Sequence, residues 1–535
     1  MRGGPLPVWG RLLGLALLGC APGLPALAAG PGPGAALDLE TVVRQTLARN
    51  PAILLQERQV EAARGGMQQS AGQFDPVLQL TARRSREQEP LNAYYRKLYR
   101  ASYGEQGGVD AIQSDTSGLS LGLDKPLRNG MVLSTSLSVT RSEGTRNDFQ
   151  GWEPQNLGKV GFSINIPLLK GSGQAAVAGE RASELEWQAS RQELRQTLAQ
   201  SLVSGVGAYW KLLAAGKSLE IAREGELGME RLLDDTRKLI AADELPAAEI
   251  NLIQARLADR RSARIAAEQS LLQARQTLGL AMGLPYGEAI AGLDVQGDFP
   301  PPPRQLPEQL PDARPLVEGA LARRPDLEAA RLRQEAALVL ADAARSNLRP
   351  QLDLNLGVGY AGLAEGGSGR HYYDAFGEHT TGASGGVTLS YRWALGNNSA
   401  EGGLAQRNAL HDQASLNHYN LARSISLAVE STLAGLVRSA RQLLASEESV
   451  AIYRVSLENE RIKNRLGSST ILDVLSVDES LRNARLAHVN YQLNYLMALA
   501  NLGYETGALV RDESSAQQVD LGRFVSMPPL NGAPE

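Results

Sequence analysis

The sequence has few of the residues that disulfide frameworks, metal centres and thick cores need. Cys20 is its single cysteine, which excludes a disulfide framework or a cysteine-based metal site within the chain. Aromatic residues make up 5% of the 535 positions, which suits thin helical coils better than a thick globular core. The net charge of −4 gives no basic excess, so nothing points to nucleic acid as a partner.

Long apolar runs are missing as well. Beyond residue 30 there is no uninterrupted apolar run of about 18 residues, so we expect no membrane-spanning helix. The strands of a membrane barrel would escape this test, because they are short and alternate between apolar and polar residues.

The N-terminus has the pattern of an export signal. Arg2 and Arg11 precede the apolar stretch 12–18, and small residues follow. Ala26-Leu27-Ala28 fits the A-x-A cleavage rule and predicts a signal peptide of residues 1–28. Leu17-Leu18-Gly19-Cys20 is also typical of a lipobox, which would make a lipidated Cys20 the first mature residue. The sequence leaves both open, and either places the mature protein outside the cytoplasm.

Two segments have helical periodicity over an unusual length. From about Gln174 to Asp243 apolar residues recur every three or four positions, and a second such run covers about Ala400–Leu466. A straight helix of this length spans roughly 100 Å, more than a compact domain needs, so we expect coiled coils or a tube wall. The shorter returning helices must stack end to end with 315–347 and with the N-terminal helix to match that length.

Other segments alternate apolar and polar residues with the period of two that strands have. They are 77–81, 119–123, 131–140, 160–166 and 387–393. Arg128-Asn129-Gly130 predicts a hairpin turn between two of them. The polar stretch Glu87–Ser117, with four tyrosines, is predicted as an exposed loop, and Trp393 is a candidate for an aromatic girdle.

The chain repeats itself. Leu47–Pro51 returns as Leu321–Pro325, an offset of 274, whereas Glu249 and Asp473 occupy corresponding positions 224 apart. The first copy therefore carries about 50 additional residues, which lie between Leu80 and Val160. The sequence leaves open whether this insertion at about 85–158 adds strands to a barrel or only a surface hairpin.

These patterns predict a mixed, mostly α fold. Tandem-duplicated, very long antiparallel helices would form an α-helical tube, and the strands would join a membrane β-barrel shared between several chains. Four to six strands per chain are fewer than the eight of the smallest membrane barrels, so several chains must share one. The predicted parts are a signal peptide (1–28), a first repeat (37–283, strands about 77–168, tip about 242–249), a Pro-rich connector (284–312), a second repeat (313–508, strands about 351–393, tip about 466–473) and a tail (509–535).

The stretch Gly467–Asp478 joins the second long run to its returning helix. Gly467 predicts a helix end, because glycine takes the left-handed conformation there without steric cost. Thr470 and Asp473 form an N-cap pair that opens the next helix. This predicts a hairpin tip, in which Asp473 is either a pore-lining carboxylate or a residue held by the helix dipole.

The tandem halves, the Pro-x-Leu strand starts and Gly467-x-x-Thr470-x-x-Asp473-Val474-Leu475 resemble the TolC-like outer membrane efflux protein family over about 37–508. The resemblance implies a homotrimer with a 12-stranded outer-membrane barrel above a periplasmic helical tunnel. Such a duct docks a periplasmic adaptor (membrane fusion) protein and an inner-membrane pump. It exports small molecules or proteins in tripartite efflux or type I secretion, with no catalytic residues, cofactor or metal, from the outer membrane of a Gram-negative-type bacterium.

The resemblance also implies an entrance at the periplasmic tips. Asp473 falls on the first of the family's second-half aspartates, Ser476 on the next acidic position, and Asp478 lies two further. Ser469 occupies the position of a basic latch residue, and Glu249 replaces the first-half aspartate. We therefore expect an acidic but differently latched entrance. The adaptor-contacting tip residues implied are Leu466, Gly467 and Leu472.

A periplasmic coiled-coil scaffold or adaptor without a pore is the alternative from another class. It explains the helices but gives the alternating strands no role. An enzyme is not expected, because no nucleophile–base pair, metal cluster or nucleotide loop is found. His371 and His379 lie in a glycine-rich loop without helical context, and Gly171-Ser172-Gly173 lacks the remaining residues of a phosphate loop, so it predicts a strand-to-helix joint.

Overall fold

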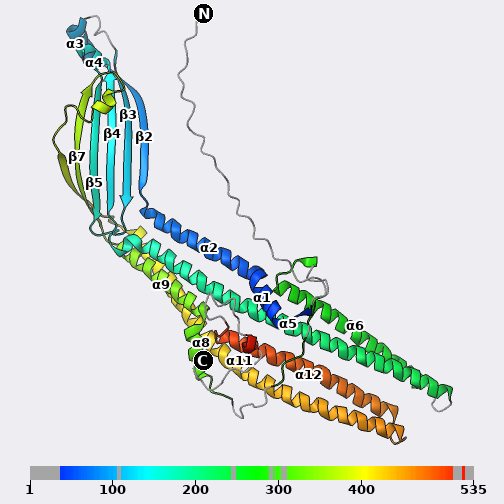
Figure 1. Cartoon of the computed structure of the whole chain (residues 1–535). Coiled ribbons are helices and arrows are strands. Elements are labelled where there is room, and N and C mark those ends of the chain that lie inside the picture. Colours follow the sequence, from blue (N-terminus) through cyan, green and yellow to red (C-terminus); the bar gives the residue numbers. More distant parts are fainter. Residues whose placement is uncertain are drawn as a thin grey trace, which may run out of the picture.

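A computed structural model describes residues 36–104, 110–242, 249–287, 293–295, 297–302, 310–509 and 521–524. It is an elongated molecule with one curved sheet at one end and a bundle of long helices running away from it (Figure 1). The predicted signal peptide with Cys20, most of the first tip and most of the tail lie outside the described residues.

Two helices of 68 residues run the length of the bundle. They are α5 (Gln174–Ala241) and α11 (Asn398–Arg465), and each spans roughly 100 Å, as the periodicity predicts. The chain enters α5 directly from the sheet through Gly171 and Gly173, which have φ of +81° and +61°. The strand-to-helix joint is therefore confirmed. In the described part of the chain, no helix combines the length and apolarity needed to cross a membrane.

Shorter helices complete the wall of the bundle. They are α1 (Leu39–Arg49), α2 (Pro51–Ala71), α6 (Glu249–Ala281), α8 (Arg314–Arg323), α9 (Pro325–Ser346) and α12 (Ile471–Glu505). Near the sheet, α5 packs against α2 and α9, and α9 packs against α11; further away, α5 packs against α6 and α12. The wall is thus four helices wide at both levels (Figure 1).

The stacked helices of the first repeat meet at a joint around Asn50. Its side chain accepts a hydrogen bond from the Ala52 backbone N–H (2.9 Å) and donates one to the Ala281 carbonyl at the end of α6 (2.8 Å). Gly283 then turns the chain with φ of +67°, and a Cβ there would lie 2.2 Å from the Arg49 carbonyl oxygen. The joint is therefore held by one neutral side chain and one glycine that no other residue can replace without strain.

The second repeat builds the same joint with charge. Arg324 is 7% exposed and makes ion pairs with Asp326 (2.7 Å) and with Glu505 at the end of α12. Its guanidinium lies 5.2 Å from the centre of the Tyr504 ring. Gly507, with φ of +66°, packs against the backbone of the opposing helix break. The expected end-to-end stacking is confirmed in both repeats.

The sheet has six antiparallel strands in the order β2-β3-β4-β5-β7-β8. They are β2 (Val77–Pro90), β3 (Ala111–Pro126), β4 (Val132–Gly144), β5 (Gln155–Pro167), β7 (Gln351–Glu365) and β8 (Ser384–Arg392). The first repeat contributes four strands and the second two, so the insertion adds strands. A 12-stranded trimeric barrel would take four strands from each chain, whereas the sheet of this chain has six. A short parallel pair, β1 (Ala36–Leu37) with β6 (Asp294–Val295), lies beside the bundle.

The expectation of an exposed loop over Glu87–Ser117 is wrong. β2 continues to Pro90, the helix α3 (Ala93–Tyr103) follows, and β3 begins at Ala111. Polar cross-strand pairs extend the sheet past its apolar rows, and Arg86 binds Asp115 through two hydrogen bonds of 2.6 and 2.9 Å. Such pairs stabilise strands that carry no apolar alternation, so the sequence pattern alone could not find them.

Two further short helices, α4 (Thr145–Gln150) and α10 (His371–Asp374), belong to the remaining loops that join the strands. With α3, α4 lies at the end of the sheet away from the long helices (Figure 1). Trp393 follows β8 at the opposite end and is 58% exposed, so its place in an aromatic girdle stays a prediction.

We expect Gly283→Ala to lower the stability of the helical bundle by about 1–3 kcal/mol, because the new Cβ must be accommodated at positive φ and against the Arg49 carbonyl. The measurement is the midpoint temperature at which helical circular dichroism is lost. Gly228→Ala on α5 is the matched control, since nothing lies within 4 Å of its added Cβ. Equal midpoints for the two variants would contradict the role given to the joint.

Candidate functional site

The tip of the second repeat begins where α11 ends. Gly467 has φ of +70°, and its N–H donates to the Asn464 carbonyl (3.0 Å). The next N–H, of Ser468, donates to the Lys463 carbonyl (3.0 Å). This pair of bonds is the Schellman arrangement that closes helices with a left-handed glycine. The predicted helix end at Gly467 is therefore confirmed.

The returning helix α12 opens with a capping box. The Asp473 N–H donates to the Thr470 hydroxyl (3.3 Å), and the Asp473 carboxylate accepts from the Thr470 backbone N–H (3.0 Å) and hydroxyl (2.6 Å). These hydrogen bonds, the side-chain one first, hold the pKa of Asp473 below its usual value. Of the two interpretations of Asp473, the geometry favours the helix cap.

Ser469 connects this cap to α11. Its hydroxyl donates to Glu460, and its carbonyl accepts from the Asn464 side chain (2.9 Å). The Ser469 hydrogen bond, together with Lys463 at 3.0 Å, lowers the pKa of Glu460. The tip is thus tied to α11 by a network of Ser469, Glu460, Lys463 and Asn464. Glu460 was missed from the sequence, because only the folded turn brings position 460 to position 469.

The remaining tip residues face solvent in the chain. Leu466 is 77% exposed and Leu472 is 53% exposed, beside the exposed Gly467. Ser476 is exposed as well, and its carbonyl accepts from the Ser480 hydroxyl (2.9 Å). Glu249 begins α6, and its side chain lies outside what is described, as do residues 243–248.

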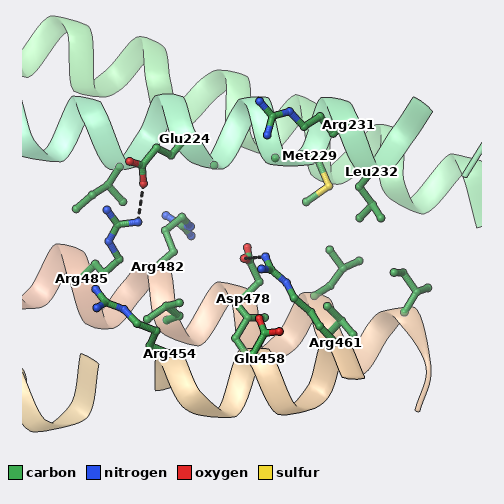
Figure 2. Close-up of a pocket in the computed structure, with 18 of the residues that line it drawn as sticks. Glu224, Met229, Arg231, Leu232, Arg454, Glu458, Arg461, Asp478, Arg482 and Arg485 are labelled. Atoms are coloured by element: carbon green, nitrogen blue, oxygen red, sulfur yellow. Dashed lines mark hydrogen bonds and ion pairs between the residues drawn. The ribbon is translucent and has the colours of Figure 1, made fainter. Parts of the chain in front are cut away.

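Asp478 belongs to a second charged group, further up the helices. Its carboxylate lies 3.9 Å from Arg260 of α6 and 3.9 Å from Arg461 of α11. Figure 2 shows it facing a cavity of about 670 Å³ whose walls come from α5, α11 and α12. The cavity is lined by charges of both signs. It lies between two coiled coils, one of α5 with α6 and one of α11 with α12.

Ion pairs bridge the two coiled coils around this cavity. They are Arg485–Glu224 (2.6 Å), Arg256–Glu479 (3.5 Å) and Arg260–Asp478 (3.9 Å). Arg482 lies among them, and its Nε is one of the buried polar atoms of the described chain that lacks a hydrogen-bond partner. Burial, and then the nearby Arg260, lower the pKa of Arg482. Of these residues only Asp478 was identified from the sequence, since a helix surface does not reveal which charges will face another helix.

Comparison with known proteins gives the class of the molecule. Residues 316–508 match the model of the outer membrane efflux protein family. The chain is 26% identical over 352 residues to outer membrane protein TolC of Escherichia coli (strain K12), covering 64% of this chain and 68% of that one. Among solved structures, the outer-membrane channel OprN has a TM-score of 0.64 at 17% identity, over 88% of this chain and 90% of its own.

A second solved structure agrees. The Campylobacter jejuni CmeC outer membrane channel has a TM-score of 0.64 at 14% identity, over 93% of this chain and 95% of its own. The fold is thus that of an outer-membrane channel with an α-helical tunnel and a β-barrel part. The part of the chain from residue 316 to 508 belongs to the outer membrane efflux protein family, whose TolC-like members lie in the outer membrane with a large periplasmic tunnel. This family consists of efflux channels rather than enzymes, and the pore-free scaffold is left without support.

Thr470→Ala and Asp473→Asn separate the two interpretations of Asp473. If the carboxylate serves the cap, both variants should speed amide hydrogen exchange in 470–475, because an N-cap is worth about 1 kcal/mol. Acidification should lower the protection of these amides in the parent protein, measured against the intrinsic exchange rate at each pH, since a lowered pKa means stabilisation that is lost as pH falls below the usual aspartate value. Ser476→Ala is the control. A change in cation selectivity for Asp473→Asn without faster exchange would instead make Asp473 a pore residue.

Proposed function

We propose that three copies of this chain form an outer-membrane export duct that docks a periplasmic adaptor and an inner-membrane pump. The observation that carries the proposal is the continuous passage from the six-stranded sheet into α5 and α11, helices of 68 residues each. The sheet is open at both edges in one chain, and a membrane-embedded strand edge needs a partner for its backbone groups. The duct would pass small molecules or proteins from the periplasmic side to the outside.

The adaptor contact is proposed at the exposed tip. Leu466, Gly467 and Leu472 present apolar and backbone surface at the end of the bundle furthest from the sheet. Large apolar side chains this exposed at the end of a helical hairpin suit packing against the helices of another protein. A trimer would offer three copies of this tip.

The assembly is tested by its state in the cell. We expect trimers that resist detergent until heated, found in the outer-membrane fraction, and defined conductance steps when the purified protein is added to a planar bilayer. The physical reason is that strand edges paired between chains are protected from detergent and separate only with the barrel. A monomer in the soluble periplasmic fraction would contradict the proposal.

We also propose that the three ion pairs between the coiled coils hold the entrance closed. Arg485–Glu224 and Arg256–Glu479 are partly exposed and worth less than about 1 kcal/mol each, and Arg260–Asp478 joins a buried guanidinium to a partly exposed carboxylate at 3.9 Å. Closure therefore depends on the sum of the three and can be reversed by a partner protein. The mixed-charge cavity beside them gives the two coiled coils room to move apart or together.

Reversing one charge of the shortest bridge should open the entrance. Glu224→Arg places a cation beside Arg485, so we expect a larger single-channel conductance than in the parent protein. The double variant Glu224→Arg with Arg485→Glu should restore the parent value. The control is Glu40→Arg, which removes an ion pair within α1 (2.7 Å to Arg44) that joins no coiled coils. If Glu224→Arg conducts like the parent, the bridges are not a latch.

A further inference from the structure

One face of the sheet carries an apolar band across the strands β2 to β7. Leu80, Leu121, Leu137, Val160 and Tyr360 form one cross-strand row from β2 to β7. The next row contains Leu78, Leu123, Phe162 and Val358, and most of these side chains are exposed in the single chain. Membrane barrels present such a band to lipid. The inserted strands β3 and β4 continue this band, which Thr135 of β4 interrupts in the second row.

The opposite face is polar over the same strands. Between the two apolar rows lies a row of Gln79, Gly122, Ser136, Gly161 and Gly359, and Thr81, Ser120 and Ser138 continue it on the other side of the first row. Small and polar residues suit the water-filled interior of a barrel. A surface hairpin outside the barrel wall would have no reason to keep the same two faces in register.

The loops have the asymmetry of a membrane barrel. The β3–β4 connection, Leu127–Met131, lies at the helical end of the sheet and is a tight turn, in which the Leu127 N–H donates to the Met131 carbonyl. The connections that contain α3 and α4 lie at the far end and are longer (Figure 1). Short turns on the periplasmic side and long loops outside are typical of outer-membrane barrels. The inserted pair thus has its short turn at the helical end of the sheet and its long loops at the far end, as a membrane-crossing pair would.

The two edges of the sheet are β2 and β8, and neither has a second neighbour among the described strands. We propose that β2 of one chain pairs with β8 of the next, and that three chains of six strands close a barrel of 18 strands, including β3 and β4. The inference rests on the trimer of the proposed function. The strand that pairs at each edge belongs to another copy of this chain. The only other described strands, β1 and β6, pair with each other.

The additional strands set the width of the exit. With strands about 4.8 Å apart and tilted about 40°, 18 strands enclose a barrel roughly 36 Å across between backbones, against roughly 24 Å for 12. The tunnel wall, four helices wide per chain, gives twelve helices at a spacing of about 9–10 Å and hence a similar width. The duct therefore does not narrow where helices give way to strands, which fits bulky cargo.

Single cysteines on the inserted strands test the inference. Ser120→Cys and Ser138→Cys on the polar face should react with a charged, water-soluble maleimide about tenfold faster than Leu121→Cys and Leu137→Cys, because a thiolate forms readily only in water. The last two, labelled with a fluorophore in proteoliposomes, should be quenched by brominated lipid. Equal reactivity of all four and no quenching would place the hairpin outside the wall and overturn the inference.

A matched pair on β5 separates this inference from the proposed function. Ser163→Cys and Phe162→Cys lie on opposite faces of a strand that any barrel of this chain must use. A difference in maleimide reactivity between the two faces on β5, without such a difference on β3 and β4, would support the duct but reject a barrel of 18 strands. Loss of contrast on β5 as well rejects the barrel itself.

Removal of the insertion gives an independent measurement. Replacing residues 91–154 by a short glycine-containing turn would join β2 directly to β5. The apolar faces of the two strands would still match, because Leu78 and Phe162 lie on the same face of the sheet. The trimer should then admit only smaller neutral polymers from the outer side than the parent protein does. An unchanged size limit in an assembled trimer would contradict the widening.

Discussion

The length of α5 and α11 is the constraint on which the rest of the structure depends. The other helices of the bundle are much shorter than these 68 residues. They must therefore stack end to end in pairs to cover the same length. The stacked helices meet at two joints. Around Asn50 the break between α1 and α2 contacts the end of α6, and around Arg324 the break between α8 and α9 contacts the end of α12. Once the joints are fixed, the sheet lies at one end of the wall and the tips at the other.

The sequence was most informative where a local rule decides the structure. The long periodic runs predicted α5 and α11, Gly467 predicted a helix end, and the Thr470–Asp473 spacing predicted a capping box, because each depends on residues within one turn. It failed where contacts between distant residues decide. The outer halves of β2 and β3 are held by pairs such as Arg86–Asp115, which no alternation pattern contains.

The charged group between the coiled coils illustrates the same limit. Glu224, Arg256 and Arg485 look like ordinary solvated helix residues in the sequence, and they become bridges only because two coiled coils face each other there. The prediction of the number of strands from the sequence was limited for a different reason. The offset between repeats located an insertion of about 50 residues, but the sequence could not show that it pairs into the sheet.

The two joints differ in how freely they can change. Asn50 is neutral, so its replacement leaves the Ala281 carbonyl and the Ala52 N–H without their partner but leaves no unbalanced charge. Arg324 is buried between two carboxylates, and its loss would leave Asp326 and Glu505 facing each other without a counter-ion. A descendant of this chain could therefore change Asn50 alone, although not Gly283, whereas the three charged residues of the second joint must evolve as a set. Mutational tolerance is unevenly divided between two halves that began as copies.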